Sequence, residues 1–406
     1  MHCKWAGYLK LLIVLLSVNS LFSRDSKYAF PEKYDMEYLL DVWMGTLYWD
    51  WQRDFNNWNS GMQVSMGCFS MQEFYVNTDL KIERNLWEDL NFKFRYQKEE
   101  LIDAVEENRE FTLFWQFKSG PRVAMHLYPS FIKRESDNGY SIGWHKKNID
   151  IDAGLIVNDF DNNWSYSEDK DGKQKFYKSY PLTYFMETKY RHAENIHSTF
   201  SFYYTRQSKA EYKIIEKPDS TYYEAVKKVR LKGYHLYQPQ DHIAIGLREF
   251  YRFDYDEEYD HKDADKNLFF KRETVIIEPM FYYIFKKPNL WIGASCQILN
   301  EILYRKETQN IKRENLLPTI SINHHLFWKL DMNTTYLRSD VNFENYGMDG
   351  RSDGVQNRII SAIEFPFNNG ARFQFRKGWE LDRGDDMWGP GFFLYDKIHC
   401  HLIVQF

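Results

Sequence analysis

Residues 392–406 read FFLYDKIHCHLIVQF and alternate strictly in character. The even-numbered positions are apolar except for Asp396, whereas most odd-numbered positions are polar, among them Lys397 and His401. Because successive side chains of a strand point to opposite faces, the pattern predicts a strand with one apolar and one hydrated face. The apolar face would contact either a soluble core or a lipid bilayer.

The same period of two recurs from about residue 40 to the end of the chain, and helical spacing is nearly absent. In residues 89–97, for example, Phe92 and Phe94 alternate with Lys93 and Arg95. Comparable segments lie at 74–83, 122–131, 149–158, 358–367 and 371–379. The fold is therefore expected to be all-β.

Composition narrows the class of protein. Aromatic residues make up 18% of the chain and charged residues 27%, and the mean hydropathy is −0.64. After residue 23 there is no apolar run of about 20 residues, the length that a membrane-spanning helix needs. A membrane β-barrel, whose lipid face uses only every second residue, fits this balance, and so does a soluble all-β protein. The net charge of −5 with interspersed signs gives no basic surface for nucleic acid.

The first 23 residues have the layout of a secretory signal peptide. Lys4 and Lys10 precede or flank an apolar core from Leu11 to Val18, and small residues follow. The alternative, an anchor helix, is disfavoured because about eight apolar residues cannot span a bilayer. Residues 24–38 are expected to form a periplasmic segment. The next residues, 39–58, are expected to form the first strand, a plug or a further periplasmic segment.

The connections between strands differ in length in a regular way. Short turns are predicted at 192–195, 238–241, 286–289, 329–331 and 368–370, the last an Asn-Gly hairpin signal. Longer polar stretches lie at 161–179, 206–220, 254–267, 305–315, 342–354 and 382–391. Because long and short connections alternate, all long loops would lie on one side of a barrel, as in transmembrane barrels. We predict a transmembrane antiparallel up-and-down β-barrel of about 16–18 strands over residues 39–406.

The signal peptide, the hairpin meander and a last strand ending in Phe406 together resemble a Gram-negative, porin-like outer-membrane β-barrel protein. The resemblance implies residence in the cell outer membrane, contact with its lipids, and recognition of the last strand by the barrel-assembly machinery. In that interpretation Ile398, Leu402, Val404 and Phe406 form the insertion signal. The resemblance is to an architecture, so it assigns no functional residue from a particular family.

Charged side chains of both signs fall on the predicted inward faces. The candidate pore-lining residues are Lys93, Arg95, Asp150, Asp152, Arg248, Arg252, Glu364, Arg372, Arg376 and Lys397. One interpretation is a charged lining that selects solutes. The other is a solvated wall, or cross-strand pairs that fill a narrow lumen, such as Glu364 with Arg372 and Arg376.

Chemistry beyond transport has little support in the sequence. There is no G-x-S-x-G motif, so no enzyme and no cofactor are expected. The histidine pairs His324–His325 and His399–His401 lack a third metal ligand, and no metal site is predicted. Cys3, Cys68, Cys296 and Cys400 are too widely spaced for a disulfide framework.

The sequence leaves three hypotheses. The first is an outer-membrane channel for small polar solutes, the second a non-conducting barrel that acts as a sheath, adhesin or assembly component, and the third a secreted soluble β-protein. A homo-oligomer is compatible with each of the first two.

Overall fold

The computed structural model describes residues 58–68, 74–101, 104–129, 135–146, 148–161, 173–192, 195–214, 217–260, 268–285, 290–305, 311–326, 330–344, 354–367, 371–381 and 398–406. The strands are β1 (Gly61–Cys68), β2 (Phe74–Trp87), β3 (Leu90–Leu101), β4 (Ala104–Gln116), β5 (Pro121–Pro129), β6 (Glu135–Lys146), β7 (Ile149–Asp161), β8 (Lys173–Ser179), β9 (Leu182–His192), β10 (Ile196–Ile214), β11 (Lys217–Gln240), β12 (Ile243–Asp260), β13 (Leu268–Phe285), β14 (Leu290–Arg305), β15 (Ile311–His325), β16 (Asp331–Glu344), β17 (Gly354–Pro366), β18 (Arg372–Glu380) and β19 (Ile398–Gln405). No helix among these residues is long and apolar enough to cross a membrane.

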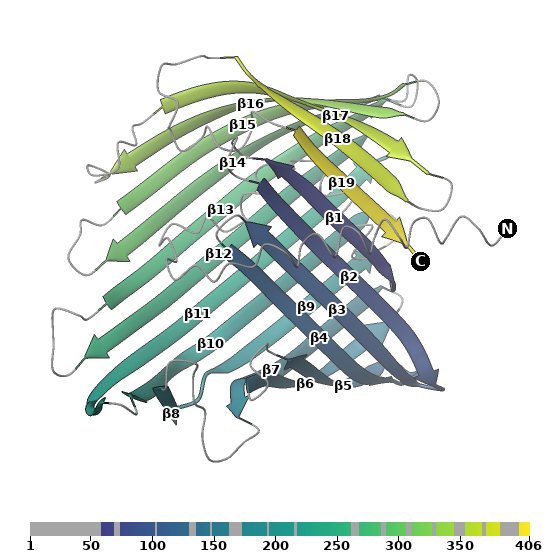
Figure 1. Ribbon diagram of the computed structural model, residues 1–406. Helices are drawn as coiled ribbons and strands as arrows, with labels where there is room; N and C mark the ends of the chain where they lie inside the picture. The colour runs from purple at the N-terminus through teal and green to yellow at the C-terminus, as the bar shows by residue number, and fades with distance from the viewer. Residues whose placement is uncertain are drawn as a thin grey trace.

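The strands form one closed antiparallel barrel (Figure 1). Neighbours in sequence are neighbours in the sheet, and β1 closes the wall by pairing with both β2 and β19. The closing register runs from Gly61 opposite Gln405 to Gly67 opposite His399. Closure pairs the backbone groups of the first and last strands, so no sheet edge faces lipid there.

The 19 strand segments build a wall of 18 strands, because β8 and β9 lie end to end along β10. Tyr180 and Pro181 interrupt them. Proline has no N–H to donate to the ladder, so the strand breaks at this point. The Pro181 carbonyl still accepts a hydrogen bond from the Asn158 N–H of the neighbouring strand at 3.0 Å. The predicted range of 16–18 strands is confirmed at its upper end.

The two faces of the wall differ as the alternation predicts. On β5, Val123 and Leu127 are 50% and 37% exposed and point outward, whereas Ala124 and His126 are 3% and 7% exposed and point inward. The same alternation brings Leu113 and Trp115 of β4 outward. The exterior therefore presents apolar side chains to the surroundings, and the interior collects the polar ones.

Aromatic side chains ring the end of the barrel that carries the short turns. Trp87, Trp115, Trp144, Tyr237 and Tyr283 all lie near these turns and are between 37% and 74% exposed. Such a ring is typical of the membrane–water boundary of outer-membrane barrels. A closed barrel with an apolar exterior and an aromatic ring is a transmembrane barrel, and it resides in the cell outer membrane.

The wall is tall at β10, β11 and β12, which contain 19, 24 and 18 residues. The prediction of a long loop at 206–220 is wrong, because β10 and β11 continue through it as far as residues 215–216. Where a strand extends beyond the bilayer, both of its faces contact water and carry polar residues. Such a segment therefore has the amino-acid composition of a loop.

Smaller errors have the same cause. Parts of four other predicted loops are strand: 173–179, 254–260, 311–315 and 342–344. Of the predicted short turns, the one at 238–241 lies entirely within the described residues, and there the chain turns at Asp241 and His242 between β11 and β12. The other four fall partly or wholly outside them. The predicted signal peptide (residues 1–23), residues 24–38 and residues 39–57 lie outside the described residues.

A cluster of three polar side chains lies on the outward face within the apolar band. Ser198 of β10 contacts His235 Nδ1 of β11 at 2.5 Å, and His235 Nε2 contacts Glu249 Oε1 of β12 at 3.0 Å. A Cβ atom at Gly233 would meet Glu249 Cγ at 3.0 Å, so the glycine gives the glutamate room to fold along the wall. By bonding to one another, these groups lower the cost of placing polar atoms against lipid.

Candidate functional site in the barrel lumen

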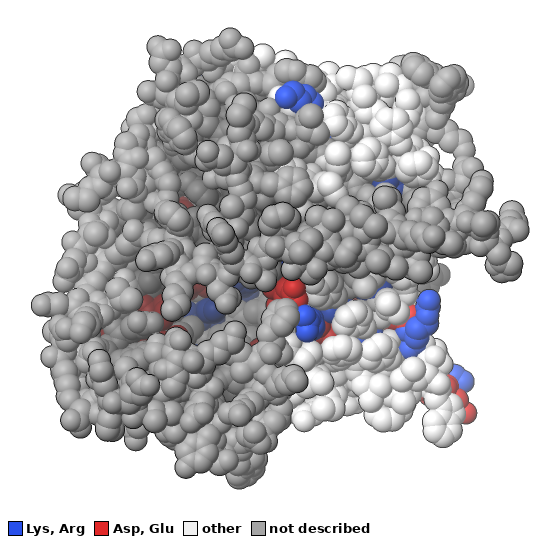
Figure 2. Space-filling view, in the orientation of Figure 1, with Lys and Arg blue, Asp and Glu red and all other residues white. Residues whose placement is uncertain are grey.

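The predicted pore-lining residues occupy three parts of the inner wall. Lys93 and Arg95 lie on β3, Asp150 and Asp152 on β7, Arg248 and Arg252 on β12, Glu364 on β17, and Arg372 and Arg376 on β18. All nine lie on the inward-facing side of their strands. Lys397 lies outside the described residues. Figure 2 shows charged side chains gathered in a central recess, beside a described surface that is mainly uncharged.

A bidentate pair organises the wall at β2 and β3. Arg95 Nε and Nη2 donate to the two carboxylate oxygens of Asp79 at 3.1 and 2.8 Å. Gln97 Nε2 of β3 donates to the same carboxylate at 3.3 Å. Asp79 is 8% exposed, so several donors share a carboxylate that has little access to water. Charge-assisted bidentate pairs of this kind fix the side-chain geometry.

A second network links β3 to β6. Glu110 of β4 accepts a hydrogen bond from the Thr112 hydroxyl at 2.7 Å and lies 3.2 Å from His126 Nδ1. His126 Nε2 contacts Ser141 Oγ at 2.8 Å, and Lys93 Nζ lies 3.9 Å from Glu110. The network ties four neighbouring strands together through side chains that point into the lumen.

A third network surrounds Asp152. His145 Nε2 lies 2.9 Å from Asp152 Oδ2 and its Nδ1 lies 3.3 Å from Asp150 Oδ1, while Arg122 Nη1 lies 3.7 Å from Asp152. A Cβ atom at Gly143 would meet Asp152 Oδ1 at 2.2 Å. Only glycine therefore leaves space for the carboxylate to lie over β6.

Positive charges from two distant parts of the chain meet near these networks. Lys81 of β2 is 8% exposed, and its ammonium group interacts with the charges of Lys93, Arg95 and Lys189. Lys189 comes from β9 and interacts in turn with Glu187 on the same strand. We call Lys81, Lys93, Arg95 and Lys189 the lumenal cation cluster.

The tall side of the barrel holds the most buried ion pair. Arg248 Nη2 of β12 lies 2.5 Å from Glu278 Oε2 of β13, and both side chains are 4% exposed. Ser295 of β14 donates to Glu278 at 2.8 Å and contacts the Thr319 hydroxyl of β15 at 2.6 Å. The pair and its hydroxyl partners therefore connect four strands inside the lumen.

Two further pairs lie higher on the same wall. Arg272 donates to Glu301 at 2.7 and 3.0 Å, and the Thr274 hydroxyl donates to the same carboxylate at 3.1 Å. Arg252 pairs with Asp254, two residues along β12. Arg252 is thus engaged with a neighbour on its own strand.

The third group lies near the closing strands. Arg372 Nη1 lies 3.9 Å from Glu364 Oε1, as the hairpin pairing predicts. Arg376 Nε donates to Gln374 Oε1 at 2.5 Å. His401, on the inward face of β19, is 5% exposed and lies opposite Gln374 in the register.

Many inward side chains have almost no exposed surface. Thr112 is 0% exposed, and Thr274, Gln297 and Gln374 are each 1% exposed. Near the short-turn end Ile403 is fully buried, and Trp58 packs against it. At these positions the inward side chains are covered by other atoms.

Metal ligation has no support among the described residues, where no group of three or more His, Cys, Asp or Glu is placed to hold an ion. His325 lies 2.8 Å from Asp331 instead. Within the same residues, Cys296 and Cys400 are free thiols. Both lie on the outward face.

Several lumenal residues were not among the candidates from the sequence. Glu110, Arg122, His126 and His145 make contacts as close as those of the predicted set. The alternation over 109–116, where Phe111, Leu113 and Trp115 point outward, is the signal that could have placed Glu110 inside.

The residues of the predicted insertion signal lie on β19. Leu402 and Val404 point outward beside Val64 and Met62 of β1, and Phe406 is 47% exposed. The Phe406 N–H donates to the Ser60 carbonyl at 3.4 Å. Ile398 begins the strand.

Comparisons with known proteins give similarity to solved barrels only. No protein-family model matches the chain, and no curated protein matches it. A bacterial polysaccharide outer membrane secretin shares 11% identity at a TM-score of 0.41, covering 86% of this chain and 98% of its own. OccK8 (OprE) of Pseudomonas aeruginosa shares 10% at 0.41, covering 86% and 97%. OprD of the same organism shares 9% at 0.41, covering 85% and 93%. The barrel fold is established by the strand pairing of this chain itself.

Proposed function

We propose that the protein is a porin-like channel that carries small polar solutes across the outer membrane and has no enzymatic activity. The observation that carries the proposal is the set of charged networks on the inward face of a closed barrel whose outer face is apolar. Charged side chains that line a narrow aqueous path select solutes by charge and hydrogen bonding.

The lumenal cation cluster is the proposed selectivity element. Its four cations come from β2, β3 and β9 and face carboxylates such as Asp79 and Glu110. A passing solute would meet both signs within a few ångströms, which favours polar and zwitterionic solutes over apolar ones. Asp150, Asp152, Arg248, Arg252, Glu364, Arg372, Arg376 and Lys397 are proposed to line the rest of the path.

Conductance in planar lipid bilayers tests the proposal. Purified protein is expected to give stable single-channel steps in simple salt solutions. If bilayers that demonstrably contain folded protein stay silent with salts and with neutral sugars or amino acids, the channel function is refuted.

Neutralising two cations of the cluster is expected to change ion selectivity. In Lys93→Gln/Lys189→Gln the attraction for anions falls by roughly 1 kcal/mol, which corresponds to about a fivefold shift of the permeability ratio toward cations. The reversal potential across a salt gradient measures this ratio. Lys118→Gln, in the turn between β4 and β5, serves as the control and should leave the ratio unchanged. If the double variant and the control have the same permeability ratio, the cluster does not determine ion selectivity.

A non-conducting barrel is the second candidate, and the near-complete burial of inward side chains such as Gln297 favours it. In that case the ion pairs would hold the wall together without lining a path. Silent bilayers would support this candidate.

We also propose contacts with partners. Outer-membrane lipids would cover the apolar exterior, and the barrel-assembly machinery would read Ile398, Leu402, Val404 and Phe406. Deletion of Phe406 is then expected to lower the amount of folded protein in outer membranes without changing the stability of refolded protein. Equal assembly of the deletion variant and the complete chain would contradict this role. A homo-oligomer remains compatible with the proposal.

A further inference from the structure

Lysines on aromatic rings occupy the outward face of the tall wall. Lys178 and Lys209 both lie over the Tyr223 ring, at 4.4 and 4.8 Å from its centroid. Lys227 and Lys271 lie over the Phe253 ring at 5.7 and 5.5 Å. We call these four lysines and two rings the lysine–aromatic patch. Cation–π contacts hold ammonium groups in place without neutralising them.

The sheet register places the residues of the patch in adjacent rows across the strands. Lys227, Tyr255, Lys271 and Tyr304 lie opposite one another in a single row across β11 to β14. The next row toward the strand tips contains Lys209 of β10, opposite Ala225. Lys271 Nζ also lies 4.8 Å from the centroid of the Tyr304 ring. The cations therefore form a rigid array, because each is fixed by its strand position and by a ring.

Among the described residues, three of these cations contact aromatic rings and pair with no carboxylate. Lys178 pairs with Glu211 at 3.2 Å, whereas the contacts of Lys209, Lys227 and Lys271 within the described residues are ring contacts. The nearby carboxylate of Glu257 accepts a hydrogen bond from Tyr255 at 2.5 Å. Three ammonium groups therefore point outward with N–H donors that can bind a ligand.

The height of the patch matches one layer of the membrane. Tyr255 lies twelve residues above Ile243, where β12 begins beside the aromatic ring of the short-turn end. At about 3.4 Å per residue and a tilt of about 40°, the row lies roughly 30 Å above that end. The apolar band of such a barrel is about 25 Å tall, so the lysines lie just beyond it, at the level of the outer-leaflet headgroups.

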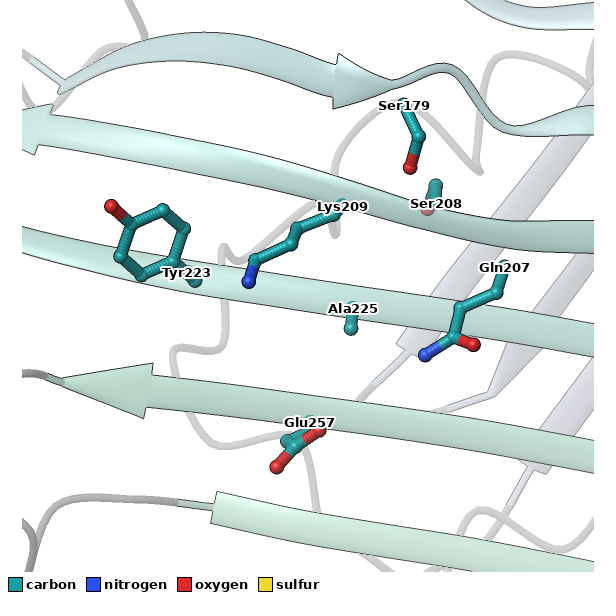
Figure 3. A pocket seen from close by; sticks show the side chains of 7 residues that line it. All are labelled: Ser179, Gln207, Ser208, Lys209, Tyr223, Ala225 and Glu257. Atoms are coloured by element: carbon teal, nitrogen blue, oxygen red, sulfur yellow. The ribbon is translucent and has the colours of Figure 1, made fainter.

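A groove adjoins the lysines on the same face. Figure 3 shows the side chain of Lys209 extending between Tyr223 and Ala225, with Glu257 on the facing strand. The groove has a volume of about 510 Å³ and is open to the outside. Its floor at Ala225 is small and apolar, so a headgroup can approach the ammonium group closely.

We propose that the lysine–aromatic patch binds the phosphate groups of an outer-leaflet glycolipid. Lys209, Lys227 and Lys271 donate hydrogen bonds to phosphate oxygens, and the acyl chains run down the apolar wall below them, over Val229 and Leu231. The aromatic rings of the patch lie at the depth that amphipathic aromatic side chains prefer in membranes. This site lies outside the lumen and is independent of solute passage.

Lipid retention tests the proposal. Purified protein is titrated in detergent with diphosphorylated lipid A, with its dephosphorylated form and with inorganic phosphate, and bound lipid is counted by native mass spectrometry. Diphosphorylated lipid A is expected to bind at least tenfold more tightly to the natural chain than to Lys209→Gln/Lys227→Gln/Lys271→Gln. The dephosphorylated form should not distinguish the two chains. Binding of inorganic phosphate with the same affinity would overturn the lipid assignment.

A matched control keeps the test specific. Lys146 also lies over an aromatic ring, that of Trp144 at 5.1 Å, but at the short-turn end of the barrel. Lys146→Gln should retain the lipid like the natural chain, and a loss equal to that of the triple variant would overturn the proposal. If the triple variant does not fold, Lys271→Gln alone is expected to weaken binding at least threefold, and unchanged binding would refute the site. Conductance should be the same in all these variants, which separates this result from that of the channel experiment.

Discussion

Replacing Glu278 with leucine is expected to destabilise the folded barrel by about 3–5 kcal/mol, because the substitution leaves the buried Arg248 guanidinium without the carboxylate that lies 2.5 Å away. Both side chains are 4% exposed, so water compensates only part of the lost interaction. Unfolding by urea in lipid vesicles, followed by tryptophan fluorescence, measures the loss. The result would show that the pair is a structural unit of the inner wall.

The double variant Arg248→Met/Glu278→Leu separates the two contributions to this effect. Removing both charges abolishes the uncompensated cation, so most of the lost stability is expected to return. Ser295→Ala removes only one neutral partner of Glu278 and should cost about 1 kcal/mol. A double variant as unstable as Glu278→Leu would mean that packing, and not the unpaired charge, causes the loss.

Replacing Ile320 with arginine is expected to cost about 2–4 kcal/mol of membrane folding stability, because the new charge would face lipid near the bilayer centre. Ile320 is 53% exposed on the outward face of β15. It lies five residues from His325 at the short-turn end, or about 13 Å along the barrel axis. Half of the apolar band is about the same height.

The gel shift between folded and heat-unfolded forms reports the fraction of Ile320→Arg that inserts into vesicles. Ile320→Leu keeps the apolar character and should insert like the natural chain. A variant with arginine that folds equally well in plain buffer, without lipid, would contradict the assignment of this face to the membrane.

The sequence predicts strands and their faces well, because alternation is a local pattern that needs no knowledge of partners. Phe92 and Phe94 point away from Lys93 and Arg95 whatever lies beside them. Strand ends are harder to predict. Beyond the bilayer both faces of β10 and β11 are wet, so Lys209 and its neighbours have the composition of a loop.

Contacts between side chains across the lumen depend on the strand register and on barrel closure. The sequence predicts the register only where a short turn joins two strands. The contact of Glu364 with Arg372 was predictable, because a tight turn fixes the pairing of its two strands. The approach of Lys189 to Lys81 was not, since β9 and β2 are neighbours only across the interior of the closed barrel. The break at Pro181 likewise turns two sequence segments into one strand of the wall.

The height of the wall at β10 to β12 has a consequence beyond the bilayer. β11 alone contains 24 residues, which span about 60 Å along the axis, more than twice the height of the apolar band. The upper part of this sheet therefore stands in the aqueous layer outside the lipid headgroups, where it would set how closely other surface molecules can approach this side of the barrel.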